Sequence, residues 1–322
     1  MIRNLTKQLL LSCLLLSNHA LADLTPEQEQ SRDYGLMLYN QHMGISAIEP
    51  LRVAAKAGDV DAQYYLGETL RLNAMYMTAE AAQWYEAAAN QGNLFAMLRL
   101  SSTQDLCSLF TDCVRDDTEW RERALEQGRQ RAERGDTSAM IALYLADQGL
   151  SWLEKSAELG DHYAQYLLAG FYRDGDGWFL IPGKREETIE QLLKSSSEGG
   201  YPPSMLLYIS YLSKREDYAG VRQWIIRSAE RGYIDAIYSY AAHSAHLPES
   251  FDFEKDYIRS YALFHILSEL KGGGVAPEYS RNKLNELSSL MPSNQIKQAM
   301  AFAKAWKKSN PPPSYFLPAY GF

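Results

Sequence analysis

The chain has 322 residues and a formal net charge of −8 at neutral pH, because 40 acidic residues outnumber 32 basic ones. An acidic surface argues against a nucleic-acid ligand, whose phosphates require clustered cations, and against docking on an anionic membrane. It allows a protein partner with basic patches but does not require one.

The first 22 residues predict a secretory signal peptide. Arg3 and Lys7 give a basic start, Leu9–Leu16 an apolar core, and Ala20–Ala22 a small-residue cleavage site. Cleavage after Ala22 would remove two basic residues and no acidic ones. The mature chain would then have 30 basic and 40 acidic residues, a net charge of −10. This segment predicts export to the periplasm.

Lipid attachment and a membrane-spanning helix are both disfavoured. Leu10–Cys13 loosely resembles a lipoprotein cleavage box, but the apolar run before Cys13 is only about one helical turn, short of the usual core of about 7–15 residues. No later run approaches the ~20 apolar residues that span a bilayer. We therefore expect a soluble periplasmic protein without an anchor at Cys13.

A short motif recurs six times along the rest of the chain. In each copy a glycine is followed four residues later by alanine or serine, between two amphipathic stretches. Periods of 25 to 43 residues, as found here, are typical of repeated helix pairs. The motif glycines are Gly58, Gly92, Gly135, Gly160, Gly200 and Gly232.

Each copy predicts the end of one helix and the start of the next. Glycine adopts the left-handed conformation that ends a helix, and the Asp or Asn that follows it in several copies can cap the next one. The small residue and the residue four positions later share one helical face, which predicts the contact between stacked helices. These predicted core residues are Ala62, Leu66, Ala96, Leu100, Ala139, Leu143, Ala164, Leu168, Ala236 and Tyr240.

Cys107 and Cys113 are the only cysteines that would remain after cleavage, in an insertion at about residues 101–118. Two nearby thiols in an oxidising compartment favour a disulfide, which would stabilise the protein by about 2 kcal/mol. A metal site would need two further ligands, and no histidine lies between the cysteines. We therefore predict a disulfide and no metal.

The motifs around these glycines resemble Sel1-like repeats, relatives of the tetratricopeptide repeats. The resemblance implies an all-α, right-handed α-solenoid of stacked antiparallel helix pairs and a role in protein binding. It places the repeat array at residues 23–248 and a C-terminal helical closing pair at 249–308. The matching segments are Ala62–Gly67, Ala81–Ala88, Trp152–Gly160, Ala164–Gly177 and Trp224–Gly232.

An apolar loop is a first candidate contact with a partner. Trp178 and Phe179 follow Gly177 in an insertion that ends at Gly183. Large apolar side chains in a loop either fold back onto the stack or form a docking patch. Both interpretations stay open here.

The second candidate is the tail at residues 309–322, whose prolines exclude a helix. Tyr315, Phe316 and Tyr320 make it an extended aromatic strip suited to a groove. The strip could line the concave face of its own chain or bind another molecule. The sequence does not distinguish these possibilities.

No motif indicates catalysis or a cofactor. The sequence has no Gly-x-Ser-x-Gly elbow, His-Glu-x-x-His helix or phosphate-binding loop. His243 and His246 are three residues apart, but a metal would need further ligands, and their position before Pro248 is typical of a helix C-terminus. We expect no catalytic residue, cofactor or metal.

The leading hypothesis is a non-catalytic periplasmic scaffold that holds a protein on its concave face, such as an effector or an envelope protein with basic patches. A narrower hypothesis, implied by the resemblance, is an immunity-type inhibitor of a secreted type VI lipase effector. The alternatives are a weak β-lactam-binding or hydrolysing enzyme and a cell-wall glycan binder. The enzymatic relatives carry a cysteine pair in each repeat, whereas this chain has one pair in an insertion.

Overall fold

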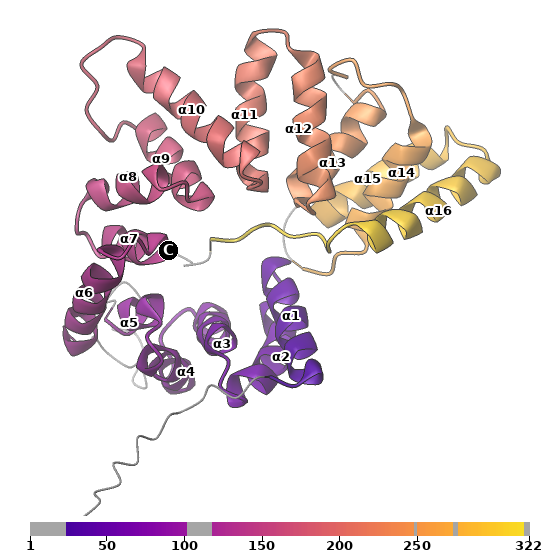
Figure 1. Ribbon diagram of the computed structural model, residues 1–322. Helices are drawn as coiled ribbons and strands as arrows, with labels where there is room; N and C mark the ends of the chain where they lie inside the picture. Colours follow the sequence, from indigo (N-terminus) through magenta and orange to yellow (C-terminus); the bar gives the residue numbers. More distant parts are fainter. Residues whose placement is uncertain (1–23, 102–117, 248–249, 273–275, 319–322) are drawn as a thin grey trace, which may run out of the picture.

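The computed structural model describes residues 24–101, 118–247, 250–272 and 276–318. Within these ranges the chain forms sixteen α-helices, and the one β-type pairing found there is an isolated bridge between Tyr233 and Ser314. The helices follow one another around a common centre, and the C-terminal tail crosses that centre (Figure 1). The predicted all-α solenoid is confirmed. Outside the described residues lie the predicted signal peptide, Cys13, Cys107, Cys113 and Tyr320.

Each helix packs against the next along the chain, except that α16 packs against α14. The first eight helices are α1 (Pro26–Asn40), α2 (Gly44–Lys56), α3 (Val60–Ala74), α4 (Ala79–Asn90), α5 (Leu94–Leu100), α6 (Thr118–Ala132), α7 (Thr137–Leu145) and α8 (Leu150–Glu158). The second eight are α9 (His162–Asp174), α10 (Lys184–Glu198), α11 (Pro202–Lys214), α12 (Tyr218–Glu230), α13 (Ile234–Ser244), α14 (Tyr257–Ser268), α15 (Ala276–Ser288) and α16 (Ser293–Ser309).

The turn between paired helices is built by the repeated glycine and the residue after it. All six motif glycines have φ between 84° and 98°, the left-handed region that ends a helix. In four copies the next residue caps the following helix, because its side-chain oxygen accepts the third helical N–H at 2.7 to 3.0 Å. The capping residues are Asp59, Asn93, Asp136 and Asp161.

The stacked helices bury the residues that the repeat pattern selects. All ten predicted core residues are buried, and the five alanines among them have no exposed surface. The small residues let neighbouring helices approach closely, as Gly67 illustrates: a Cβ there would lie 2.9 Å from the Tyr85 ring. The core therefore runs as a series of layers between successive helices, which is the packing of a solenoid.

The closing segment differs from the predicted helical pair because it contains three helices. Residues 276–288 form α15 as a separate helix, and α14 packs against both α15 and α16. The apolar side chains of α14 explain this arrangement. Leu263, Phe264 and Leu267 are all fully buried, so α14 needs neighbours on more than one side.

The two ends of the array meet. Gly272, which follows α14, lies against the turn between α1 and α2: a Cβ on Gly272 would be 1.7 Å from the carbonyl oxygen of Gln41. The tail reinforces this contact, because Tyr315 packs on the main hydrophobic core and Leu317 packs on the separate core of α1–α3. The array thus closes into a ring. None of the helices in the described ranges is both long and apolar enough to cross a bilayer.

Candidate functional site: the concave face and the tail that occupies it

Residues 311–317 lie along the concave face in an extended conformation (Figure 1). On one side the tail hydrogen-bonds to the end of α1. The Tyr315 N–H donates to the Asn40 carbonyl at 2.9 Å, and the Leu317 N–H donates to the Asn40 side-chain oxygen at 3.2 Å. The Gln41 side chain donates to the Pro313 carbonyl at 2.8 Å. The structure therefore places the tail in its own chain's groove, the first of the two possibilities left by the sequence.

On the other side Ser314 pairs with the turn between α12 and α13. The Ser314 N–H donates to the Gly232 carbonyl at 2.8 Å, and the Ile234 N–H donates to the Ser314 carbonyl at 3.0 Å. Ile234 is the first residue of α13, whose N–H has no partner within the helix. The preceding Tyr233 gives no side-chain cap. The tail therefore supplies the acceptor that this helix start lacks.

Phe316 is held between two tyrosines. Its ring centroid lies 6.4 Å from that of Tyr201 and 5.9 Å from that of Tyr233, both in edge-to-face geometry. Tyr201 also contacts Tyr163 and Tyr166 on α9 edge to face, at 5.8 and 5.1 Å. Burial raises the pKa of the Tyr201 and Tyr233 phenols. The concave face thus presents an uncharged aromatic clamp for one side chain.

The clamp tyrosines were not among the predicted site residues, although the repeat pattern contains a signal for them. Tyr201 and Tyr233 follow Gly200 and Gly232, at the position where the first four copies have a capping Asp or Asn. In the fifth copy the helix starts with Pro202 and Pro203, which have no N–H, so of the first three helical residues only Ser204 has an N–H to cap. In the sixth copy the tail accepts the first helical N–H, that of Ile234. The two copies that lack an acidic or amide cap are therefore the two that hold Phe316.

Gly232 leaves room for the tail, so replacing it with alanine is expected to release the tail. A Cβ at Gly232 would lie 2.7 Å from the Pro312 carbonyl oxygen, whereas a Cβ at Gly135 would meet no atom within 4 Å. Both glycines have a left-handed φ, 84° and 88°. Alanine should therefore cost about 1 kcal/mol at either position. Only Gly232→Ala should speed deuterium exchange at the Ser314 and Ile234 amides, by about tenfold or more.

Gly135→Ala is the matched control for that experiment, because it carries the same backbone cost without touching the tail. Equal exchange rates in the two variants would contradict the placement of residues 311–317 against Gly232.

Cavities flank the tail on both sides. One, of about 830 Å³, lies between α1 and the tail and is lined by Tyr34, Met37, Asp33, Arg231 and residues 311–314. Another, of about 370 Å³, is lined by Ser138, Asp161 and Tyr163 together with Phe316 and Leu317. The groove is therefore wider than the segment that fills it.

A third concave cavity, of about 380 Å³, is lined by one acidic and one basic side chain. Asp61 and Arg131 line it, together with Tyr64 and Phe95. Burial raises the pKa of Asp61, and the neighbouring Asp59 carboxylate raises it further. A cation placed near Asp61 would relieve both effects. Arg131 lines the same cavity and supplies such a cation, so the lining as a whole carries no net charge.

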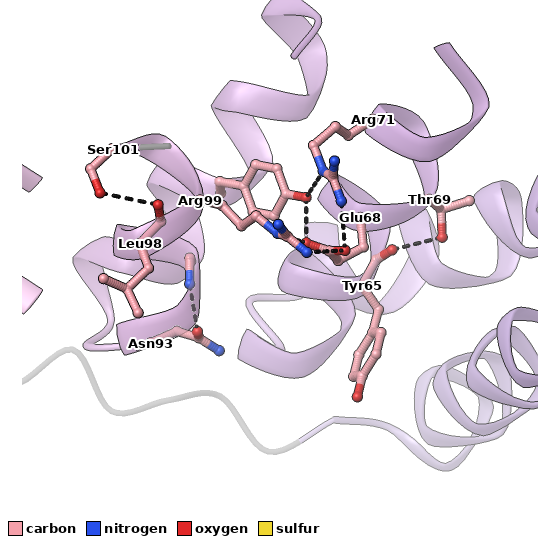
Figure 2. Close-up of polar contacts among 10 residues, drawn as sticks. Tyr65, Glu68, Thr69, Arg71, Asn93, Leu98, Arg99 and Ser101 are labelled. Atoms are coloured by element: carbon pink, nitrogen blue, oxygen red, sulfur yellow. Dashed lines mark hydrogen bonds and ion pairs between the residues drawn. The ribbon is translucent and has the colours of Figure 1, made fainter. Parts of the chain in front are cut away.

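A buried ion cluster links α3, α4 and α5 (Figure 2). Glu68 has no exposed side-chain surface, and Arg99 and Arg71 are 6% and 9% exposed. Arg99 donates to both carboxylate oxygens of Glu68 at 2.5 and 3.2 Å, Arg71 donates at 3.2 Å, and the Tyr85 hydroxyl donates at 2.8 Å. The cluster crosslinks three successive helices.

Buried charges often mark functional sites, but here the carboxylate of Glu68 is bonded to side chains of three helices, which is the arrangement of a structural link. Burial raises the pKa of the Tyr64 and Tyr85 phenols, and the Glu68 carboxylate raises them further. A tyrosine with a raised pKa is a poor proton donor at neutral pH. The sequence did not predict this cluster, although Glu68 and Arg99 stand out as charges on apolar helical faces.

In the loop at residues 177–183, one large apolar side chain folds back onto the helices and others are exposed, so both possibilities left by the sequence occur. Phe179 folds back, because its ring lies 5.0 Å from the Tyr172 ring and the Arg185 guanidinium lies 4.8 Å above it. Trp178 points outward and is 85% exposed. Leu180 and Ile181 are exposed as well. The structure therefore separates Trp178 and Phe179, and neither lines the two cavities beside the tail.

His243 lies in the last turn of α13 and His246 follows the helix, and both contact the loop beyond it. The His243 ring stacks on Phe253 with centroids 5.9 Å apart. A ring nitrogen of His246 is 2.8 Å from the Phe253 carbonyl oxygen. In the described part of the chain, no three His, Cys, Asp or Glu side chains gather as a metal site would require.

Solved structures similar to this one include Sel1-type repeat proteins. A protective antigen of uropathogenic Escherichia coli strains with an SLR fold is 18% identical, with a TM-score of 0.48, and covers 88% of this chain. This chain spans 62% of the antigen. A Sel1 repeat protein from Oxalobacter formigenes is 22% identical with a TM-score of 0.43, and the match covers 87% of this chain and 88% of that one.

An assembly chaperone of RpL4 is 14% identical, with a TM-score of 0.30 over 82% of this chain and 98% of the chaperone. No protein-family model matches the sequence, and no curated protein matches it.

Proposed function

We propose that the chain is a non-catalytic protein-binding scaffold that holds an extended segment of a partner protein on its concave face. The observation that carries the proposal is the seating of residues 311–317 on that face by main-chain hydrogen bonds and an aromatic clamp. A surface that orders one extended peptide in this way has the donors, acceptors and apolar pocket that peptide recognition uses.

The proposal includes a partner with basic patches. The whole chain is acidic. Asp161 lines one concave cavity in which no basic side chain takes part, whereas Asp33 and Asp61 share their cavities with Arg231 and Arg131. Complementary charge of this kind would speed encounter and select against acidic partners. The proposed compartment is the periplasm, on the basis of the N-terminal sequence, and there Cys107 and Cys113 would be joined as a disulfide.

Site-specific photocrosslinking tests the proposal. A photoreactive residue at Ser138, which lines a concave cavity beside the tail, should crosslink to one defined envelope protein in living cells. The same group at Lys194, which is exposed on α10 and lines none of the concave cavities, should not. The crosslink should weaken when the salt concentration is raised in membrane-free extracts. Absence of any product at Ser138, or equal products at both positions, would contradict the proposal.

A further inference from the structure

The strip that holds the tail recognises features that many extended peptides share. We define the tail-binding strip as Asn40–Gln41, Tyr201 and Gly232–Ile234. It contributes main-chain or amide hydrogen bonds to Pro313, Ser314, Tyr315 and Leu317, and one aromatic clamp. Main-chain hydrogen bonds contribute affinity for a peptide of any sequence. The clamp adds a preference for an aromatic side chain.

The tail lies on this strip but is not buried there. Every residue from 311 to 318 keeps solvent exposure, and none is buried. Phe316 has a φ of 49°, a left-handed conformation that is unfavourable for a bulky side chain. Cavities of about 830 and 370 Å³ remain on its two sides. A segment that filled these cavities would make contacts that the tail does not make.

We propose that the tail-binding strip is the docking site for an extended partner segment that contains prolines and an aromatic residue, flanked by basic residues, and that residues 311–317 occupy the strip as an intramolecular competitor. The inference rests on the proposed function. The prolines and the aromatic residue follow from the seated tail. The basic flanks follow from Asp161, which lines a neighbouring cavity without a basic side chain, and from the net negative charge of the chain. The net charge of −8 disfavours a second copy of this chain as the occupant.

Tethering makes the tail an effective competitor even if its contacts are weak. A short flexible connection gives a local concentration on the order of millimolar. A partner segment must compete with the tethered tail for the strip. Its apparent affinity for the intact chain is therefore lower than its affinity for a chain with a loosened tail.

A labelled peptide with the sequence of residues 310–318 tests the proposal by fluorescence anisotropy. Phe316→Ala in the full chain removes the clamped ring but leaves the strip intact, so this variant should bind the peptide about tenfold or more tightly than the unaltered chain. A second substitution, Gly232→Ala, should abolish binding because it blocks the strip, whereas Gly135→Ala should leave binding unchanged. Circular dichroism and thermal unfolding verify that each variant is folded.

Two further peptides test the partner's chemistry. A peptide with added flanking lysines should bind the Phe316→Ala chain several-fold more tightly than one with flanking glutamates at low salt, and the difference should shrink at high salt. A peptide in which the residue matching Phe316 is alanine should bind poorly.

Three results would overturn the inference. One is a Phe316→Ala chain that binds the peptide no more tightly than the unaltered chain. Another is binding that persists in the Phe316→Ala, Gly232→Ala chain. The third is a concentration-dependent dimer of the unaltered chain with exchanged tails, seen by light scattering, which would make a second copy the occupant. These measurements use no envelope protein, so they fail or succeed independently of the crosslinking test.

Discussion

Replacing Glu68 with glutamine is expected to lower the free energy of unfolding by about 3–5 kcal/mol. Glu68 has no exposed surface, and its carboxylate accepts hydrogen bonds from Arg71, Arg99 and Tyr85 on three helices. Glutamine keeps the size of the side chain but removes the charge. Both arginines would lose a carboxylate that they contact in a poorly solvated environment, where charge is costly. The thermal and urea unfolding midpoints measure the loss.

Glu187→Gln is the matched control for Glu68→Gln. Glu187 pairs with Lys184 at 3.2 Å on the exposed surface of α10, and removing such a pair costs no more than about 1 kcal/mol. If Glu68→Gln proved as mild as Glu187→Gln, the ion cluster would not be a structural link between α3, α4 and α5.

Shortening Leu66 to alanine is expected to cost about 2–5 kcal/mol, because it removes buried methyl groups and leaves a cavity. Leu66 is fully buried, and it lies on the helical face that the repeat motif predicts. On the same helix, Leu72 is 48% exposed, so Leu72→Ala should change stability by only about 0.5 kcal/mol. The difference between the two unfolding midpoints measures the contribution of one repeat layer.

Equal effects of Leu66→Ala and Leu72→Ala would contradict the layered core. A second readout is the exchange of α3 amides, which should speed up mainly in the Leu66 variant because its local packing is lost.

The helix pairs were predictable because they depend on short-range chemistry. Gly135 followed by Asp136 predicts a helix end, a left-handed turn and a cap within a few residues, and the structure has all three. The face shared by Ala139 and Leu143 follows from the helical period alone, and both are buried. Such features need no knowledge of distant parts of the chain.

The contact between the two ends of the array could not be predicted from local sequence patterns, because it joins residues that are far apart in sequence. Nothing near Asn40 indicates that it will bind Tyr315 and Leu317. The separation of Trp178 from Phe179 also depends on a neighbour, the Tyr172 ring. The division of the closing segment into three helices follows from the packing needs of α14. In each case the local sequence pattern allows more than one structure, and a tertiary contact determines which one forms.

The junction at Gly272 and Gln41, with the tail beside it, has a consequence for how the protein unfolds. An open row of repeats frays from its two terminal units, because each unit there has a neighbour on one side only. Here the first and last units support each other, so fraying must begin by parting this junction. Assembly is constrained as well: Gln41 bonds to Pro313 across 272 positions of chain. The contact between the tail and α1 can therefore form only when almost the whole polypeptide is present, and contacts of such long range form slowly.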